Sequence, residues 1–208
     1  MKLIIDIGAN SGRTIEIFKN KCDKVVAFEP NPRLVDVLTR KYHNQNVIID
    51  RRGVSNEIGT KVFNISGADT ISTFSNDWIE NSRFTSGYKW NEKIEVETIT
   101  LDSIIDEYGI PDYIKIDVEG YEYEVLSSFT KKLESTIISF EWAEEQKEKI
   151  EKIITHLNNL GYTNFSYTDE DRVMFDDEII WKSISDLNLM ENLVPERKIR
   201  WGMIYVKN

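Results

Sequence analysis

The sequence predicts an α/β fold in which a mostly parallel sheet carries helices on both faces. Residues 3–7 form an apolar run too short for a helix, followed by a glycine-containing turn and an amphipathic segment at residues 14–20. Residues 24–28 form a second apolar run, followed by an amphipathic segment at residues 32–42. Because strands that alternate with helices usually pair in parallel through crossover connections, this order predicts a doubly wound sheet.

The turn after the first strand has the composition of a cofactor-binding loop and reads Asp6-Ile7-Gly8-Ala9-Asn10-Ser11-Gly12. Gly8 and Gly12 have no Cβ, so the backbone there can turn sharply and approach a ligand closely. The spacing differs from the Gly-x-Gly-x-x-Gly of diphosphate-binding loops. The carboxylate of Asp6 disfavours a phosphate, so we expect a ligand with positive or hydrogen-donating groups.

A second acid, Glu29, follows the second strand. In Rossmann-like units an acid at this place accepts hydrogen bonds from the hydroxyls of a ribose. Asp6 or Glu29 alone could simply cap a strand or a helix. Their combination with the glycine loop favours a cofactor site.

The rest of the chain continues the alternation of strands and helices. Further strands are predicted at residues 47–50, 61–65, 93–98, 113–116, 136–140, 164–168, 172–175 and 203–206. Further helices are predicted at residues 101–108 and 119–132, at a segment with Ile150, Ile153, Ile154, Leu157 and Leu160 on one face, and at an insertion with Trp181, Leu187, Leu189 and Leu193.

Residues 67–91 lack a regular period and are rich in aromatic side chains, namely Phe74, Trp78, Phe84, Tyr88 and Trp90. A loop of this length in a compact domain is usually functional or disordered, and the aromatic content argues against disorder. We interpret the segment as a lid over an acceptor site. Trp78 and Trp90, with Trp142 from outside the segment, are the candidates for substrate contact, because aromatic faces suit the C–H face of a sugar ring. Each ring could instead pack onto the edge of the sheet.

Four motifs are together similar to those of a known family. They are the loop at residues 6–12, Phe28-Glu29-Pro30-Asn31, Ile99-Thr100-Leu101-Asp102-Ser103-Ile104-Ile105 and, most specifically, Ile114-Lys115-Ile116-Asp117-Val118-Glu119-Gly120-Tyr121-Glu122. In these motifs the chain resembles the FkbM family of S-adenosyl-L-methionine-dependent methyltransferases over most of residues 3–162. The resemblance implies a Rossmann-like methyltransferase fold with a seven-stranded, mostly parallel sheet and an antiparallel C-terminal strand. It also implies methyl transfer to a hydroxyl oxygen, often on sugars or secondary metabolites.

The residues expected at the cofactor come from the loops that follow the strands. Asp50 precedes the loop that lies along the adenine in methyltransferases. Asp117 follows a strand next to the point where the order of the sheet reverses, so it should face the transferred methyl group. The full expected set is Asp6, Gly8, Asn10, Gly12, Glu29, Asp50 and Asp117.

The candidate catalytic residues are Asp117, Glu119 and Glu141. A sulfonium methyl is already activated, so the enzyme must align the acceptor oxygen and remove or neutralise its proton. We expect His43 and His156 to lie at the surface, which leaves an acid, a lysine or a metal-bound group for this step. Asp117 with Glu119 or Glu141 could take the proton late in the transition state. Alternatively, Asp117 and Glu141 could hold a divalent cation such as Mg²⁺ that acidifies the hydroxyl.

A structural role is the alternative for two of these acids. Asp117 could be a helix N-cap, and the helix dipole alone could explain Glu119 and Glu122 in a first helical turn.

The composition fits one globular domain over residues 1–208. No apolar run approaches the ~20 residues of a membrane helix. No secretory leader precedes the first strand, so we expect a cytoplasmic location. Cys22 is the only cysteine, which excludes an intramolecular disulfide and a cysteine metal cluster. Because the first strand begins almost at Met1, the chain could be one domain of a longer polypeptide.

The charge argues against nucleic acid as a partner. Lys and Arg number 26 against 36 Asp and Glu, and the net charge of -10 repels a phosphate backbone. We expect the basic clusters at residues 51–52 and 197–200 to be solvated or to contact small anions. The expected acceptor is therefore a small molecule or a glycan.

Several alternative functions stay open. The acceptor could be a lipid, a polyketide or the ribose of an RNA, although the acidic charge disfavours RNA. The domain could bind a nucleotide or S-adenosylmethionine without catalysing a reaction. A nicotinamide-dependent oxidoreductase is disfavoured because the third glycine of its loop is missing.

Overall fold

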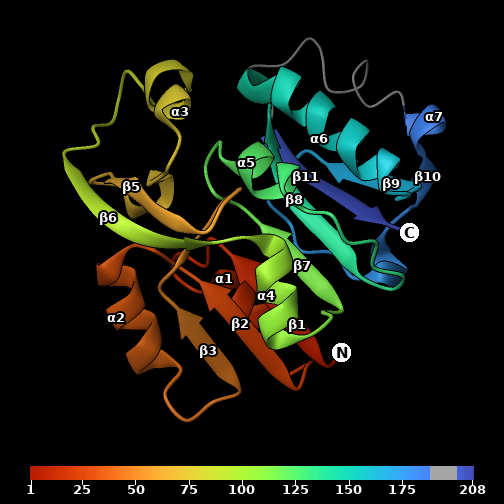
Figure 1. The fold of residues 1–208 in the computed structure, drawn as a ribbon, viewed down its shortest axis with the longest axis horizontal. Helices are drawn as coiled ribbons and strands as arrows, with labels where there is room; N and C mark the ends of the chain where they lie inside the picture. The colour runs from red at the N-terminus through yellow and green to blue at the C-terminus, as the bar shows by residue number, and fades with distance from the viewer. Residues whose placement is uncertain (188–200) are drawn as a thin grey trace.

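The computed structural model describes residues 1–187 and 201–208. The strands of its main sheet are β1 (Leu3–Ile7), β2 (Lys24–Phe28), β3 (Val47–Asp50), β7 (Tyr113–Ile116), β8 (Ile137–Ala143), β9 (Asn164–Thr168), β10 (Lys182–Ser183) and β11 (Trp201–Lys207). Their order across the sheet is β10-β9-β11-β8-β7-β1-β2-β3 (Figure 1). The five strands from β3 to β8 pair in parallel, and β11 is antiparallel to both β8 and β9.

This architecture confirms the predicted α/β class with its antiparallel C-terminal strand. The two-residue strand β10 adds an eighth position at the edge, beside β9. The strand predicted at residues 172–175 does not form. In this segment the Arg172 carbonyl instead accepts a hydrogen bond from the Tyr205 hydroxyl.

A second sheet lies apart from the main one and was not predicted as a separate unit. It contains β4 (Gly53–Val54), β5 (Gly59–Ile65) and β6 (Glu92–Ile99) in the order β4-β6-β5. Figure 1 shows β5 and β6 beyond the arrowheads of β2 and β3. The chain between these two strands contains η1 (Asp69–Ile71) and α3 (Asn76–Asn81). The small sheet therefore carries most of the segment predicted to be a lid.

Helices cover both faces of the main sheet. One face carries α1 (Arg13–Phe18) and α2 (Pro32–Lys41), and the other carries α4 (Leu101–Tyr108), α5 (Glu122–Ser127) and α6 (Lys147–Asn159). Figure 1 shows α4, α5 and α6 in front of the strands. Side chains alternate between the faces along a strand, so Ile4 joins the cluster with Phe18 while Ile5 joins the cluster with Ile104. Both isoleucines are fully buried, which contributes about 1.5–3 kcal/mol per side chain.

The helix predicted at residues 119–132 is shorter than expected. Glu119 and Gly120 have φ angles of 55° and 80°, in the left-handed region, so they cannot begin a right-handed helix. Helix α5 starts only at Glu122. The other short elements are η2 (Glu144–Gln146), η3 (Asp176–Glu178) and α7 (Ile184–Leu187). Leu189 and Leu193 of the predicted helical insertion lie outside the described residues.

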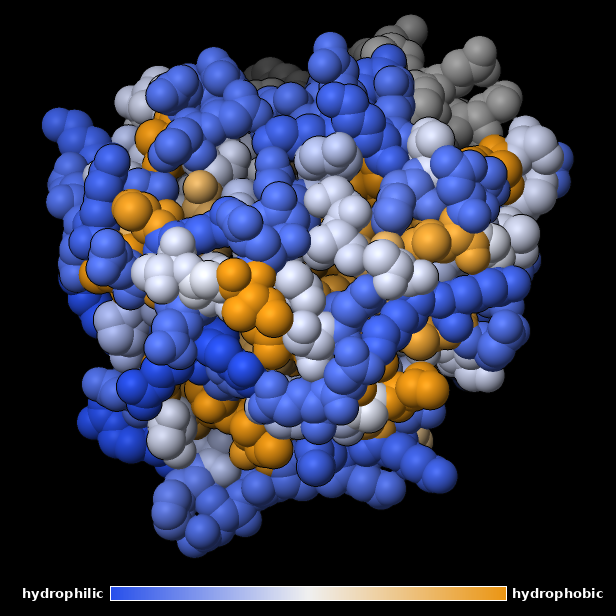
Figure 2. Space-filling view, viewed as in Figure 1, coloured by the Kyte–Doolittle hydropathy of each residue, from blue (hydrophilic) through white to orange (hydrophobic). Residues whose placement is uncertain are grey.

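The surface is mostly polar. On the face shown in Figure 2, apolar side chains form separate patches within a largely hydrophilic surface. Exposed apolar residues such as Ile58, Ile110 and Ile180 are scattered along the chain, as is common for globular proteins. Within the described ranges, none of the helices combines the length and the apolar character needed to cross a bilayer.

Candidate active site

A cavity of about 540 Å³ lies at the carboxyl ends of β1, β2, β7 and β8. Its volume is in the range of small-molecule sites. The wall combines the loop after β1, the end of β2 and the segment after β7 with residues from the predicted lid. It also includes Asp171 and Val173 from the loop after β9 and Trp201 from β11. The cavity thus lies where a doubly wound sheet binds its ligands.

Gly8 allows the loop after β1 to pass close to the segment after β7. Its φ angle is 83°, and a Cβ at this position would lie 1.8 Å from the carbonyl oxygen of Asp117. The backbone N–H groups of Gly8 and Ala9 both donate to the Phe28 carbonyl, at 3.0 Å each. The loop is therefore fixed to the end of β2, and no other residue type fits at position 8 without displacement.

Gly12 has a structural role in the loop. It has a φ angle of 82° and lies directly before α1, outside the cavity wall. A Cβ here would lie 2.6 Å from the Tyr42 hydroxyl. Gly12 therefore lets the loop pack against α2, and the structure gives it no contact with the cavity.

Glu29 lies in the cavity wall and anchors the loop. Its Oε2 accepts the backbone N–H of Asn10 at 2.8 Å, and its Oε1 accepts that of Asn31 at 2.9 Å. Asn10 lines the cavity as well. Burial raises the pKa of Glu29 to about 7, although the two N–H bonds oppose the shift. Each oxygen keeps a second lone pair, so the carboxylate can still accept hydroxyl groups of a ligand.

Asp6 lies beneath the cavity and does not line it. It is fully buried, and neither of its carboxylate oxygens has a hydrogen-bond partner among the described residues. Burial raises its pKa to about 6, and the ammonium group of Lys115 acts in the opposite direction. Asp6 pairs in register with Lys115 on the adjacent strand, so both side chains project from the same face of the sheet.

Asp117 and Lys115 form an ion pair in the wall. The Nζ of Lys115 lies 2.8 Å from Oδ2 of Asp117. Burial lowers the pKa of Lys115, but the nearby carboxylates of Asp117 and Asp6 outweigh this effect and raise it. Asp117 is not an N-cap, because α5 begins five residues later and Tyr121 precedes it.

Three further acids surround Asp117. Glu119 and Glu141 line the cavity, and Glu141 lies inside β8, which extends beyond the predicted strand end to Ala143. Glu122 accepts the Val118 N–H with its Oε1 at 2.9 Å. Oxygens of Asp117, Glu122 and Glu141 all lie within 4.8 Å of one another. The structure thus brings together the three predicted catalytic acids and adds Glu122.

The environment of these acids favours their protonated forms. Burial, and then the proximity of Asp117, raises the pKa of both Glu119 and Glu141 well above the usual value. Burial also raises the pKa of Glu122 to about 7. One oxygen of Glu119 is buried without a hydrogen-bond partner in the described part of the chain.

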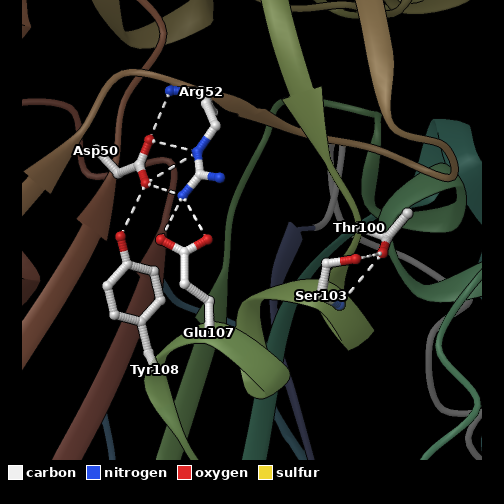
Figure 3. Close-up of polar contacts among 6 residues, drawn as sticks. All are labelled: Asp50, Arg52, Thr100, Ser103, Glu107 and Tyr108. Atoms are coloured by element: carbon white, nitrogen blue, oxygen red, sulfur yellow. Dashed lines mark hydrogen bonds and ion pairs between the residues drawn. The ribbon is translucent and has the colours of Figure 1, made fainter.

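Asp50 does not reach the cavity. Figure 3 shows its carboxylate held by Arg52 and by the hydroxyl of Tyr108, while Arg52 also pairs with Glu107. Arg52 itself lies in the wall, together with Gly53 and Val54. Asp50 therefore holds Arg52 in the loop after β3 and does not itself line the cavity.

Helix α4 supports this network. Thr100 accepts the Ser103 N–H at 3.3 Å and caps the start of the helix that carries Glu107 and Tyr108 (Figure 3).

The three tryptophans predicted to contact substrate lie away from the cavity wall. Trp78 is fully buried against Gly120, where a Cβ would approach its ring to 2.8 Å. The indole N–H of Trp90 donates to the Ile71 carbonyl at 2.7 Å, and that of Trp142 donates to the Thr168 carbonyl at 3.0 Å. The aromatic residues that do line the cavity are Phe28, Phe63, Phe74, Phe84, Tyr88 and Trp201.

The sequence analysis assigned none of the four cationic residues in the wall to the site, namely Arg13, Arg52, Arg83 and Lys115. Arg83 comes from the predicted lid and pairs with Glu145 at 3.3 Å and with Glu141 at 3.9 Å. No local pattern connects residues about 60 positions apart. Lys115 carried a detectable signal, because a lysine in the centre of a buried strand needs a partner.

Neither histidine lines the cavity. His43 is exposed, as expected. His156 differs from the expectation of a solvated side chain, since it is partly buried and its Nε2 lies 2.7 Å from the Phe129 carbonyl oxygen. The ionisable groups that the described wall presents are thus carboxylates, Lys115, arginines and the phenol of Tyr88.

Comparisons with known proteins agree with this geometry. The methyltransferase FkbM domain matches residues 6–163. A hexuronic acid methyltransferase, AglP of Haloferax volcanii, is 33% identical over 139 residues, which cover 62% of this chain and 51% of AglP. The chain thus spans about half the length of this curated relative.

Two solved structures share the fold. A methyltransferase FkbM from Methylobacillus flagellatus superposes with a TM-score of 0.50 and 15% identity, over 99% of this chain and 43% of that one. A precorrin-8w decarboxylase from Methanobacterium thermoautotrophicum gives a TM-score of 0.50 and 14% identity, over 100% of this chain and 82% of that one. At these identities the likeness concerns the fold alone.

Proposed function

The chain belongs to the FkbM methyltransferase domain family, and we propose that it transfers a methyl group from S-adenosyl-L-methionine to a hydroxyl oxygen of a sugar. One observation carries the proposal: a single cavity joins the glycine loop and Glu29 to the acids Asp117, Glu119 and Glu141. A cofactor at the first end and an acceptor at the second would meet inside one enclosure.

The residues at the loop end fit the cofactor. Glu29 presents a buried carboxylate with free lone pairs, which suits the two hydroxyls of a ribose. Because Gly8 has no side chain, no side-chain atom of this residue covers the loop backbone. When bound, the cofactor supplies a methyl group on a positively charged sulfur, and the acids of the wall suit that charge. Asn10 and Glu29 would hold it, with Asp117 at the far side.

Asp117 is the proposed base. It would accept the proton of the acceptor hydroxyl as the oxygen forms its bond to the methyl group, a step for which a positioned base contributes about 10²- to 10⁴-fold. Lys115 fixes the orientation of the Asp117 carboxylate through the 2.8 Å contact. Glu119 and Glu141 would orient the acceptor through hydrogen bonds to its other hydroxyls.

A divalent cation is the alternative way to handle the proton. Asp117 and Glu141, with Glu122 as a third ligand, offer oxygens close enough to hold an ion such as Mg²⁺. The ion would acidify a bound hydroxyl. Full activity after exhaustive treatment with EDTA would exclude this form of the proposal, and loss of activity that Mg²⁺ restores would favour it.

Two observations support a sugar as the acceptor. The matched relative is named a hexuronic acid methyltransferase. Phe84, Tyr88 and Trp201 line the same cavity as the carboxylates, and aromatic faces with polar partners suit a sugar ring.

The experiment is a transfer assay with ¹³C-methyl-labelled cofactor and a panel of sugar glycosides. We expect a labelled methyl on oxygen, located by NMR from its chemical shift and its coupling to a ring proton. A methyl on nitrogen or carbon, or no transfer to any sugar by protein that binds the cofactor, would contradict the proposal.

A further inference from the structure

We propose that the acceptor is an uncharged sugar, and that the ion pair of Arg83 with Glu145 keeps the site from accepting a sugar acid. The inference rests on the proposed function and specifies its substrate class. It differs from what the relative's name would suggest for this chain, because it is drawn from the charges of this cavity.

Every basic side chain that the described part of the cavity wall presents is already paired with a carboxylate. Arg13 pairs with Asp171 at 2.7 Å and Lys115 with Asp117 at 2.8 Å. The other two are Arg52, paired with Asp50 and Glu107, and Arg83, paired with Glu145 and Glu141. A carboxylate on the acceptor would therefore find no free cation among these residues.

The wall presents more acids than bases. Its acidic residues are Glu29, Asp69, Asp117, Glu119, Glu141 and Asp171, against Arg13, Arg52, Arg83 and Lys115. One buried oxygen of Glu119 has no hydrogen-bond partner within the described residues. A sugar carboxylate in this wall would be buried without an unpaired cation beside it among the described residues, which is strongly unfavourable. The hydroxyls of a neutral sugar, in contrast, donate hydrogen bonds that such oxygens accept.

Arg83 is the cation best placed to bind a sugar acid, and it is held in position from several sides. Its guanidinium lies 5.2 Å from the ring centre of Trp78, 4.7 Å from that of Phe84 and 5.8 Å from that of Trp201. Its side chain is only 14% exposed.

The main chain of Arg83 is held by the same acid as its side chain. Its backbone N–H donates to Oε1 of Glu145 at 3.0 Å, and Nη1 contacts both oxygens of that carboxylate at 3.3 Å. Glu145 thus both fixes the position of Arg83 and neutralises the charge of its guanidinium.

Matched pairs of acceptors test the inference. Each pair consists of a methyl hexoside and the methyl hexuronide of the same configuration, which differ only in a CH₂OH or a carboxylate at C6. With the gluco, galacto and manno pairs at pH 7.5, we expect kcat/KM to favour the neutral partner at least tenfold, in EDTA and in Mg²⁺ alike. A uronide used as well as or better than its neutral partner, in either condition, overturns the inference and leaves the proposed function intact. Failure of every sugar to accept a methyl group overturns the proposed function and this inference with it.

The Glu145→Gln variant tests the role of Arg83. Removing that charge frees the guanidinium, so we expect the preference for the neutral sugar to fall at least threefold through a higher kcat/KM for the uronide. Glu148→Gln removes one charge from an exposed position of α6 and should leave the preference unchanged.

Adding Arg83→Gln to Glu145→Gln should abolish the gain. An unchanged preference in folded Glu145→Gln protein, or a gain that persists in the double variant, would show that Arg83 does not set the specificity. Thermal melting and S-adenosylhomocysteine binding establish that each variant is folded.

Discussion

The ammonium group of Lys115 lies 2.8 Å from Oδ2 of Asp117. Both residues lie in the wall of the cavity that the glycine loop also lines. Because Lys115 is buried and also faces Asp6, it stays charged between two carboxylates. This relationship gives Asp117 a fixed orientation and makes it the acid on which the proposed chemistry depends.

Asp117→Asn is expected to lower kcat by about 10²- to 10⁴-fold, since the amide cannot take up the proton of the acceptor. The Kd for S-adenosylhomocysteine should change by less than tenfold. Steady-state kinetics with a saturating sugar acceptor give the result, and Asp36→Asn on the exposed side of α2 serves as the matched control. Wild-type kcat in Asp117→Asn would exclude Asp117 as the base.

Gly8→Ala is expected to destabilise the fold and weaken cofactor binding together. The new Cβ would lie 1.8 Å from the Asp117 carbonyl oxygen, and the φ angle of 83° is unfavourable for alanine, with a strain of about 1–3 kcal/mol. Urea denaturation and calorimetry measure the two effects. Gly59→Ala, where a Cβ meets nothing within 4 Å, should leave both values unchanged. If Gly8→Ala behaved like Gly59→Ala, the loop would not have the close approach described.

The raised pKa of Glu29 predicts a specific pH dependence of stability. Below about pH 4.5 the group is protonated in both the folded and the unfolded chain, so it does not make the free energy of unfolding depend on pH. Between that pH and about 7 the unfolded chain loses the proton while the folded chain keeps it, so this contribution falls as the pH rises. The total is about 3.4 kcal/mol, at 1.36 kcal/mol for each pKa unit.

Glu29→Gln should remove this part of the pH dependence. The free energy of unfolding of the variant, relative to wild type, should therefore increase between pH 5 and pH 8 in urea titrations. A difference between the two proteins that does not vary with pH would contradict the buried, ionisable state of Glu29.

Tyr88→Ala is expected to raise the KM for the sugar acceptor several-fold with little change in melting temperature. Its side chain lines the cavity yet is 47% exposed, so its loss removes contact area from the acceptor rather than from the core. Trp90→Ala should instead lower the melting temperature, because the indole donates a hydrogen bond to the Ile71 carbonyl. Ile110→Ala, at an exposed site outside the wall, is the control. An unchanged acceptor KM in Tyr88→Ala would argue against a sugar site formed by residues 67–91.

The alternation of strands and helices along the chain and the position of the glycine loop could be predicted from the sequence, because both depend on local patterns. A strand, a turn with Gly8 and a helix can be recognised within 20 residues, and strand ends place Glu29 and Asp117 at one edge of the sheet. The helix boundary after Asp117 was wrong, because a left-handed conformation at Glu119 has no clear sequence signal when the residue is not glycine.

The lid segment could not be predicted in the same way. Its helix α3 buries Trp78, while Phe84 and Tyr88 reach the cavity, and nothing in the spacing distinguishes these outcomes. The contact between Arg83 and Glu145 depends on how two distant segments meet in space. Such contacts follow from tertiary packing, which the sequence does not display locally.

Binding of S-adenosylhomocysteine, measured by calorimetry on wild type and on Glu29→Ala, shows whether this cavity is the cofactor site of a methyltransferase. Glu29→Gln is measured beside it, because Glu29 also holds the Asn10 and Asn31 amides and its full removal could disturb the loop. We predict micromolar or tighter binding to wild type and a loss of at least tenfold in Glu29→Ala, which is about 1.4 kcal/mol. Folded wild-type protein that shows no binding, or variants that bind as tightly as wild type, would contradict the claim that this cavity is the cofactor site of a methyltransferase.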